Sequence, residues 1–138
     1  MTQARESLVT PAEARERIRL LYVAAARTAD DPTLVEPLIL HTGLSRPGVE
    51  LALRDHVERD LDAALQALAG WHLPYADEAT VVLAANVFVA TFRAVLVASL
   101  SASRVEVRAS RREPVFSRAF VHHARELGAS WLALTAVV

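Results

Sequence analysis

The stretch ATVVLAANVFVATFRAVLVASLSASRVEVRASRREPVFS, residues 79–117, decides how the fold is interpreted. Residues 80–84 form an apolar, β-branched run, which predicts a buried strand. Residues 87–100 predict a buried helix, and residues 105–108 predict a second, short strand. Strands and helices that alternate with short connections predict parallel strands joined by right-handed crossovers.

The same alternation continues to the last residue. Residues 114–127 predict a helix that ends at Gly128, and residues 131–138 predict an apolar strand. Residues 79–138 therefore predict an α/β fold, a partial parallel β-α-β-α-β unit that is Rossmann-like. Its last strand is expected to leave an unpaired apolar edge, so we expect a truncated chain that forms homo-oligomers or associates through that strand.

The sequence of the N-terminal region, residues 1–70, predicts a series of helices. Thr10 is suited to cap a helix, and Glu13 stands three residues later, as a capping box requires. Residues 30–32 are expected to end this first helix, and Gly43 is expected to end the next one. We therefore expect a helical region over residues 1–70 and a partial nucleotide-binding region over residues 79–138.

The composition excludes several classes of protein. The chain has 138 residues, of which 53% are hydrophobic and 22% are charged, with a net charge of −1. This apolar content excludes disorder, and the balanced charge disfavours a general nucleic-acid binder. The sequence contains no cysteine, and all its basic residues other than histidine are arginines. This excludes a disulfide scaffold, a cysteine nucleophile and Schiff-base chemistry at a lysine.

Targeting and membrane signals are also weak. The first residues, MTQARE, include no apolar segment of the kind found in secretory signals. Residues 81–100 are largely apolar, but Asn86 and Arg93 interrupt them, and an arginine at the centre of a spanning helix costs about 2.5–3.5 kcal/mol. We therefore expect a cytoplasmic protein without a membrane span.

Two motifs carry a resemblance to a known family. VLAANVF at residues 82–88 falls where the aldehyde dehydrogenase superfamily has a strand that ends in an asparagine. VEVRASRREPV at residues 105–115 falls where that family has a valine-rich strand, a basic residue, a proline, a small residue, an acidic residue and Thr-Pro. Residues 79–138 resemble in particular the long-chain acyl-CoA reductase (fatty-acid reductase) branch. The resemblance implies the N-terminal portion of such an enzyme.

The resemblance implies a catalytic role for Asn86. The family's asparagine stabilises the oxyanion that develops on the substrate, and one such donor contributes about 2.7–4 kcal/mol in a transition state. The end of a parallel strand is a suitable place for this role, because it faces the ligand crevice. The alternative is that Asn86 caps a helix that begins at Val87. Both roles remain open on the sequence alone.

The resemblance also implies a cofactor site. Arg108 stands at the position of a family lysine that contacts the adenosine ribose, and Ser110 stands at the small-residue position. Arg111 replaces a glutamate that often binds the ribose hydroxyls. Because an arginine accommodates a 2′-phosphate, Arg108, Arg111 and Arg112 together predict NADP in preference to NAD. The alternative is a solvated basic turn between strand and helix.

Some family features are missing. Ala84 and Ala85 replace the Pro-Trp that usually precedes the asparagine, and the catalytic cysteine is absent. The glycine-bearing turn that receives the pyrophosphate is expected beyond Val138. We therefore expect the N-terminal part of an NADP-dependent acyl-CoA reductase or aldehyde dehydrogenase. Acyl-CoA or an aldehyde would be the substrate of the complete enzyme, and this chain would be inactive alone.

A different class of function fits residues 34–55, which resemble a helix-turn-helix with Gly43 in the turn. Its second helix is expected to expose Arg46, Glu50, Arg54 and Asp55, a mixed rather than a basic surface. The alternative function is thus a non-catalytic helical module for protein interaction or DNA binding. Elsewhere, the adjacent His122 and His123 diverge on a helix, so no metal site is expected.

Overall fold

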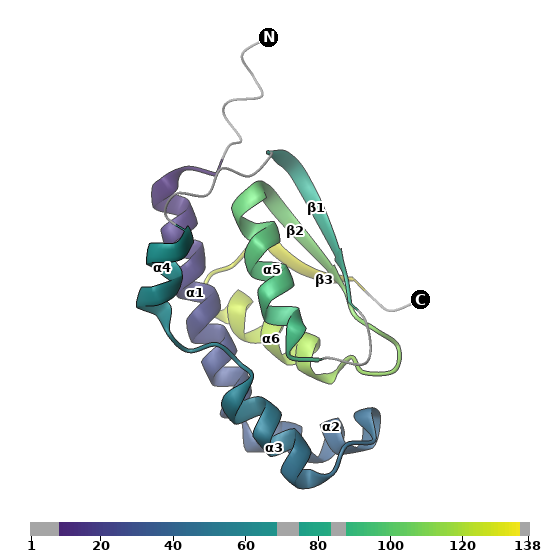
Figure 1. Cartoon of the computed structure of the whole chain (residues 1–138). Coiled ribbons are helices and arrows are strands. Elements are labelled where there is room, and N and C mark those ends of the chain that lie inside the picture. The colour runs from purple at the N-terminus through teal and green to yellow at the C-terminus, as the bar shows by residue number, and fades with distance from the viewer. Residues whose placement is uncertain (1–8, 69–74, 84–87, 136–138) are drawn as a thin grey trace.

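The computed structural model describes residues 9–68, 75–83 and 88–135. Figure 1 shows helices along one side of a small sheet. In chain order the elements are α1 (Pro11–Ala29), the 3-10 helix η2 (Pro32–Leu34), α2 (Val35–Thr42), α3 (Arg46–Asp55), α4 (Leu61–Leu68), β1 (Ala76–Val82), α5 (Ala90–Ser101), β2 (Ala102–Arg108), α6 (Val115–Glu126) and β3 (Leu132–Thr135).

The sheet has three parallel strands in the order β1-β2-β3. In its register Val82 lies opposite Arg108, and Arg108 lies opposite Thr135. The strands alternate with α5 and α6 along the chain, as crossover connections between parallel neighbours require. The prediction of an α/β fold with a parallel β-α-β-α-β order is therefore confirmed.

The helices cover one face of the sheet. Helix α5 contacts β1 and β2, α6 contacts β3, and α1 packs across both α5 and α6. Strand β2 alternates accordingly: Val105 and Val107 are buried, whereas Arg104 and Arg108 are exposed. Alternation of this kind indicates a sheet with one covered face and one polar face. It is unusual in a parallel sheet, which normally buries both faces.

One hydrophobic core joins the helical N-terminal region to the sheet region. Phe92 of α5 lies at its centre, with the ring of Tyr22 from α1 edge-on at 4.8 Å and the ring of Phe120 from α6 at 5.9 Å. Leu21 of α1 and Val107 of β2 are both fully buried. Since side chains from both regions share this core, α1 has a direct influence on the position of α5 and α6.

Local signals in the sequence determine several element ends. The Thr10 hydroxyl accepts a hydrogen bond from the Glu13 N–H at 3.1 Å, which confirms the predicted cap of α1. Gly43 ends α2 with φ +75° and Gly128 follows α6 with φ +109°. These positive φ angles favour glycine, because they strain residues that carry a Cβ.

Two expectations for the sheet region are wrong. The strand that includes residues 80–82 begins earlier, at Ala76, and it is not buried: Val82 is 75% exposed. The reason is that β1 forms an edge of the sheet with helices on only one face, so that Ala79 and Val81 are partly covered and their neighbours are not. The helix expected from Val87 begins at Ala90.

Two further expectations are only partly covered by the described residues. The final strand is present as β3, Leu132–Thr135, and residues 136–138 lie outside the described residues. Among the described residues, no helix is both long and apolar enough to cross a membrane.

Candidate functional site

The carboxyl ends of the three strands form one row at the edge of the sheet. Val82, Arg108 and Thr135 are neighbours in the register. The N–H of Leu83 donates a hydrogen bond to the carbonyl of Arg108 at 3.0 Å, so the chain leaving β1 starts beside the end of β2. In open parallel sheets, ligands bind at this edge. A ligand site is therefore expected at this edge.

Arg108 lies at the centre of this row. Its side chain is 60% exposed, and its Nε is 3.6 Å from the Glu106 Oε1. Glu106 also accepts a hydrogen bond from the hydroxyl of Thr135. An exposed ion pair at this distance contributes at most about 1 kcal/mol. The guanidinium of Arg108 is thus accessible to an anion at a small cost.

A short turn, residues 109–114, connects β2 to α6. Ser110 Oγ accepts a hydrogen bond from the Arg112 N–H at 3.1 Å, which closes the turn. Ala109 is buried below it, while Arg111 and Arg112 are exposed. The structure therefore places Arg108, Ser110 and Arg111, the predicted cofactor residues, on one strand end and its following turn.

Glu113 is a functional candidate that sequence reasoning did not assign. Its side chain is only 4% exposed, and its Oε1 accepts a hydrogen bond from the Phe116 N–H at 2.9 Å, in the first turn of α6. Burial raises the pKa of Glu113, although the N–H groups of Phe116 and Val115 and the nearby His41 oppose this effect. The signal available in the sequence was an acidic residue just before a helix, where a carboxylate is favourable.

His41 reaches the same turn from the other region of the chain. It lies in the last turn of α2, and its Nδ1 is 3.1 Å from the carbonyl oxygen of Arg112. Since a carbonyl oxygen accepts but does not donate, this contact requires a proton on Nδ1. No sequence signal identifies this contact, because 71 positions separate the two residues.

The predicted catalytic residue, Asn86, lies outside the described residues. The alternative role, a cap on a helix from Val87, also falls on residues outside the described ones; in the described part, α5 begins at Ala90 and its N-cap residue is Val89. The oxyanion role stays a prediction. What the structure adds is that the chain enters this segment from Leu83, which is hydrogen-bonded to Arg108.

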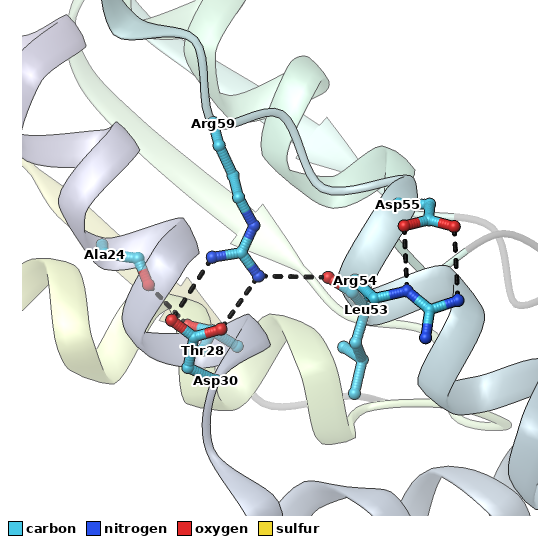
Figure 2. A network of polar contacts seen from close by, with 7 residues as sticks. All are labelled: Ala24, Thr28, Asp30, Leu53, Arg54, Asp55 and Arg59. Atoms are coloured by element: carbon cyan, nitrogen blue, oxygen red, sulfur yellow. Dashed lines mark hydrogen bonds and ion pairs between the residues drawn. The ribbon is translucent and has the colours of Figure 1, made fainter.

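The arginines of the helix-turn-helix region, and Arg59 just after it, lie close to carboxylates. In Figure 2, Arg54 faces Asp55 with Nε 3.0 Å from Oδ1, and the guanidinium of Arg59 faces both oxygens of Asp30 at 2.9 and 3.3 Å. Arg46 pairs with Glu36, and its Nη1 lies 3.8 Å from Glu50 Oε1. The α2–α3 corner is thus a charge-balanced surface, which disfavours phosphate binding.

A cleft between helices lies away from the strand ends. It has a volume of about 720 Å³ and lies between α1, the segment around Arg59 and the C-terminal part of α6. Its walls mix apolar groups such as Val23 with charges of both signs, including Arg27 and Glu126. Within the described residues, no group of three or more His, Asp or Glu side chains is arranged to hold a metal ion.

Comparison of the chain with protein-family models, curated proteins and solved structures gives no match. The geometry of the strand ends and the resemblance of the two motifs are therefore the observations that bear on function.

Proposed function

We propose that this chain is the N-terminal part of an NADP-dependent acyl-CoA reductase or aldehyde dehydrogenase and that it contributes the adenosine side of the cofactor site. One observation carries the proposal: Arg108 lies in the row of parallel strand ends and leads directly into a turn with two exposed arginines. Ligand binding at this edge is general for parallel α/β sheets.

The residues present are suited to a ribose 2′-phosphate. Guanidinium groups bind phosphate oxygens through paired, charge-assisted hydrogen bonds. Arg108, Arg111 and Arg112 would supply these donors. The Ser110 oxygen accepts the Arg112 N–H, so its hydroxyl hydrogen is left to donate to a ribose or phosphate oxygen. When bound, NADP supplies the hydride acceptor or donor of the reaction.

The role of Asn86 belongs to the same proposal. Its side-chain amide would donate to the oxyanion that forms when a thioester or aldehyde carbonyl is attacked. The attacking thiolate must come from another chain segment, because these 138 residues include no cysteine. The chain is thus expected to bind the cofactor without reducing acyl-CoA alone.

The alternative, a helical interaction or DNA-binding module, is favoured by one observation. Helices α2 and α3 are joined by a short turn with Gly43 at φ +75°, as in helix-turn-helix units. The carboxylate partners of Arg46 and Arg54 argue against a DNA-binding surface at this corner.

Calorimetric titration of the 138-residue chain with NADP and with NAD measures the two dissociation constants and tests the proposal. We expect tighter binding of NADP, and weaker binding after Arg108→Ala. Arg104→Ala is the matched control, because Arg104 lies on the same strand and the same exposed face, near Glu78 at 3.9 Å. Equal or tighter binding of NAD would contradict the NADP assignment. A gel-shift assay with duplex DNA, run in parallel, tests the alternative.

A further inference from the structure

The turn of residues 109–114 is held by the protein on both sides. On one side, the Arg112 N–H donates to Ser110 Oγ; on the other, the Arg112 carbonyl accepts from His41 of α2. Both polar backbone groups of Arg112 therefore have a partner. The next residue, Glu113, is buried and bonded to Phe116 of α6. The basic turn is thus connected to two helices from different parts of the chain.

The Glu113 carboxylate also occupies the N-terminal end of α6. Free N–H groups at a helix N-terminus are a common binding place for phosphate. Here one of them is already bonded to a carboxylate of the chain itself. A ligand phosphate at this edge of the sheet is consequently directed to the arginine side chains rather than to the helix end.

We infer that His41 and Glu113 are positioning residues that hold the 109–114 turn in the shape that binds a ribose 2′-phosphate. Through His41, the N-terminal helices would set the affinity of the cofactor site. This inference rests on the proposed function. Its physical reason is preorganisation: a turn that is fixed before binding loses less conformational entropy when the ligand arrives.

Substitutions at His41 separate the hydrogen bond from the bulk of the ring. His41→Ala removes the donor, whereas His41→Asn retains an N–H near the position of Nδ1, and His41→Gln places its N–H farther out. The probes are adenosine 2′-monophosphate and adenosine, titrated into the full 138-residue chain. We expect His41→Ala and His41→Gln to raise the dissociation constant for the phosphate ligand roughly threefold to tenfold, with His41→Asn close to the wild type. Adenosine affinity should not change.

His122→Ala is the matched control. His122 is also an exposed histidine with a polar partner, Glu126 at 2.9 Å, but it lies near the far end of α6. We expect no change in either ligand constant. Hydrogen exchange of the unliganded protein provides a second reading: the Arg112 amide should exchange faster in His41→Ala than in the wild type or in His122→Ala.

The outcomes distinguish the inference from the function on which it rests. A wild-type chain that binds adenosine 2′-monophosphate no better than adenosine overturns the proposed function and the inference together. A wild type that prefers the phosphate ligand, with His41→Ala unchanged in affinity, overturns the inference alone. Equal losses of phosphate-ligand affinity in His41→Asn and His41→Ala also overturn the inference, because the hydrogen bond would then not be the cause of the lower affinity. Glu113→Gln provides an independent check: it keeps an acceptor for the Phe116 N–H, so it should bind the phosphate ligand better than Glu113→Ala.

Discussion

Two surfaces of this protein are rich in arginine, and they differ in how those arginines are placed. On the helical side, Arg54 at the end of α3 and Arg59 just after it each have a carboxylate at about hydrogen-bond distance. At the carboxyl end of β2, the pair between Arg108 and Glu106 is longer, at 3.6 Å, and Glu106 is shared with Thr135. The comparison predicts that the distance to competing carboxylates, rather than the number of arginines, decides where an anion binds.

The largest expected effect tests this comparison directly. Arg108→Ala combined with Arg112→Ala should raise the dissociation constant for adenosine 2′-monophosphate about tenfold or more for each arginine, because a hydrogen bond to a charged group is worth about 1.5–3 kcal/mol. The control is Arg46→Ala combined with Arg54→Ala at the corner, which should leave the constant unchanged. An equal loss of affinity for adenosine 2′-monophosphate in both double variants would contradict the distinction between the two surfaces.

The second prediction concerns the anchor of the basic turn. Glu113→Ala leaves a buried N–H of α6 without its acceptor, and we expect a loss of about 1–3 kcal/mol in the free energy of unfolding. Urea denaturation measures this change. Arg111→Ala, an exposed substitution in the same turn, is the control and should change stability by less than about 0.5 kcal/mol.

The same carboxyl gives a pH dependence with a definite sign. Because burial raises the pKa of Glu113, the folded state holds its proton more tightly than the unfolded state. Its contribution is therefore most favourable below the ordinary value of 4.5 and is lost as the pH rises through the higher value of the folded state. Glu113→Gln should flatten the stability profile in that range. A profile identical to that of the wild type would show that this carboxyl titrates normally.

The fourth prediction concerns the pair between Glu58 and Arg93 on the helical side. Burial first, and then the hydrogen bond to Glu58 at 2.9 Å, raise the pKa of Tyr22 to about 12. Glu58 also pairs with Arg93. Glu58→Ala should lower the pKa of Tyr22 while leaving it above the ordinary value of 10, because the burial remains. Absorbance at 295 nm measures the titration, and Tyr22→Phe identifies the signal. An unchanged Tyr22 titration in Glu58→Ala would leave burial as the sole cause.

The smallest effect is expected at the pair between Asp30, at the end of α1, and Arg59, just after α3. The hydrogen bonds from Arg59 hold the pKa of Asp30 below its ordinary value of 3.8, so this pair contributes stability above that pH and loses it as the pH falls through the lower value of the folded state. Asp30→Asn should cost less than about 1 kcal/mol at neutral pH, since the pair is exposed. It should also release Arg59 and raise non-specific DNA binding at low salt. An unchanged gel shift would indicate that Asp30 does not neutralise this surface.

The sequence predicted the alternation of elements well because their signals are local. The Thr10 cap, the glycine at position 43 and the alternation of Val105 and Val107 with charged neighbours each act over a few residues. Burial of β1 was predicted wrongly, because its valines do not reveal whether a second layer covers them. The start of α5 was also predicted wrongly: among the described residues no side chain caps this helix, so its apolar sequence carries no clear starting signal.

The candidate site was predictable only in part, for a similar reason. Arg108, Ser110 and Arg111 are contiguous with a strand, so their placement follows from the strand itself. The contact of His41 with the Arg112 carbonyl joins residues 71 positions apart and depends on how α2 packs near α6. Contacts of this kind depend on the tertiary structure, and a single sequence carries no pattern for them.

The contacts of Arg17 in α1 affect how the protein unfolds. Its guanidinium donates to three carbonyls where α5 turns into β2, those of Ser99, Ala102 and Ser103, at 2.7–2.9 Å, and it lies 4.2 Å from the centre of the Trp131 ring. Loss of α1 would leave these carbonyl acceptors without the Arg17 donor and would remove the buried Leu21 side chain from the core. The helices and the sheet should consequently melt in one cooperative transition, and a fragment lacking the first helix should be a poor folding unit.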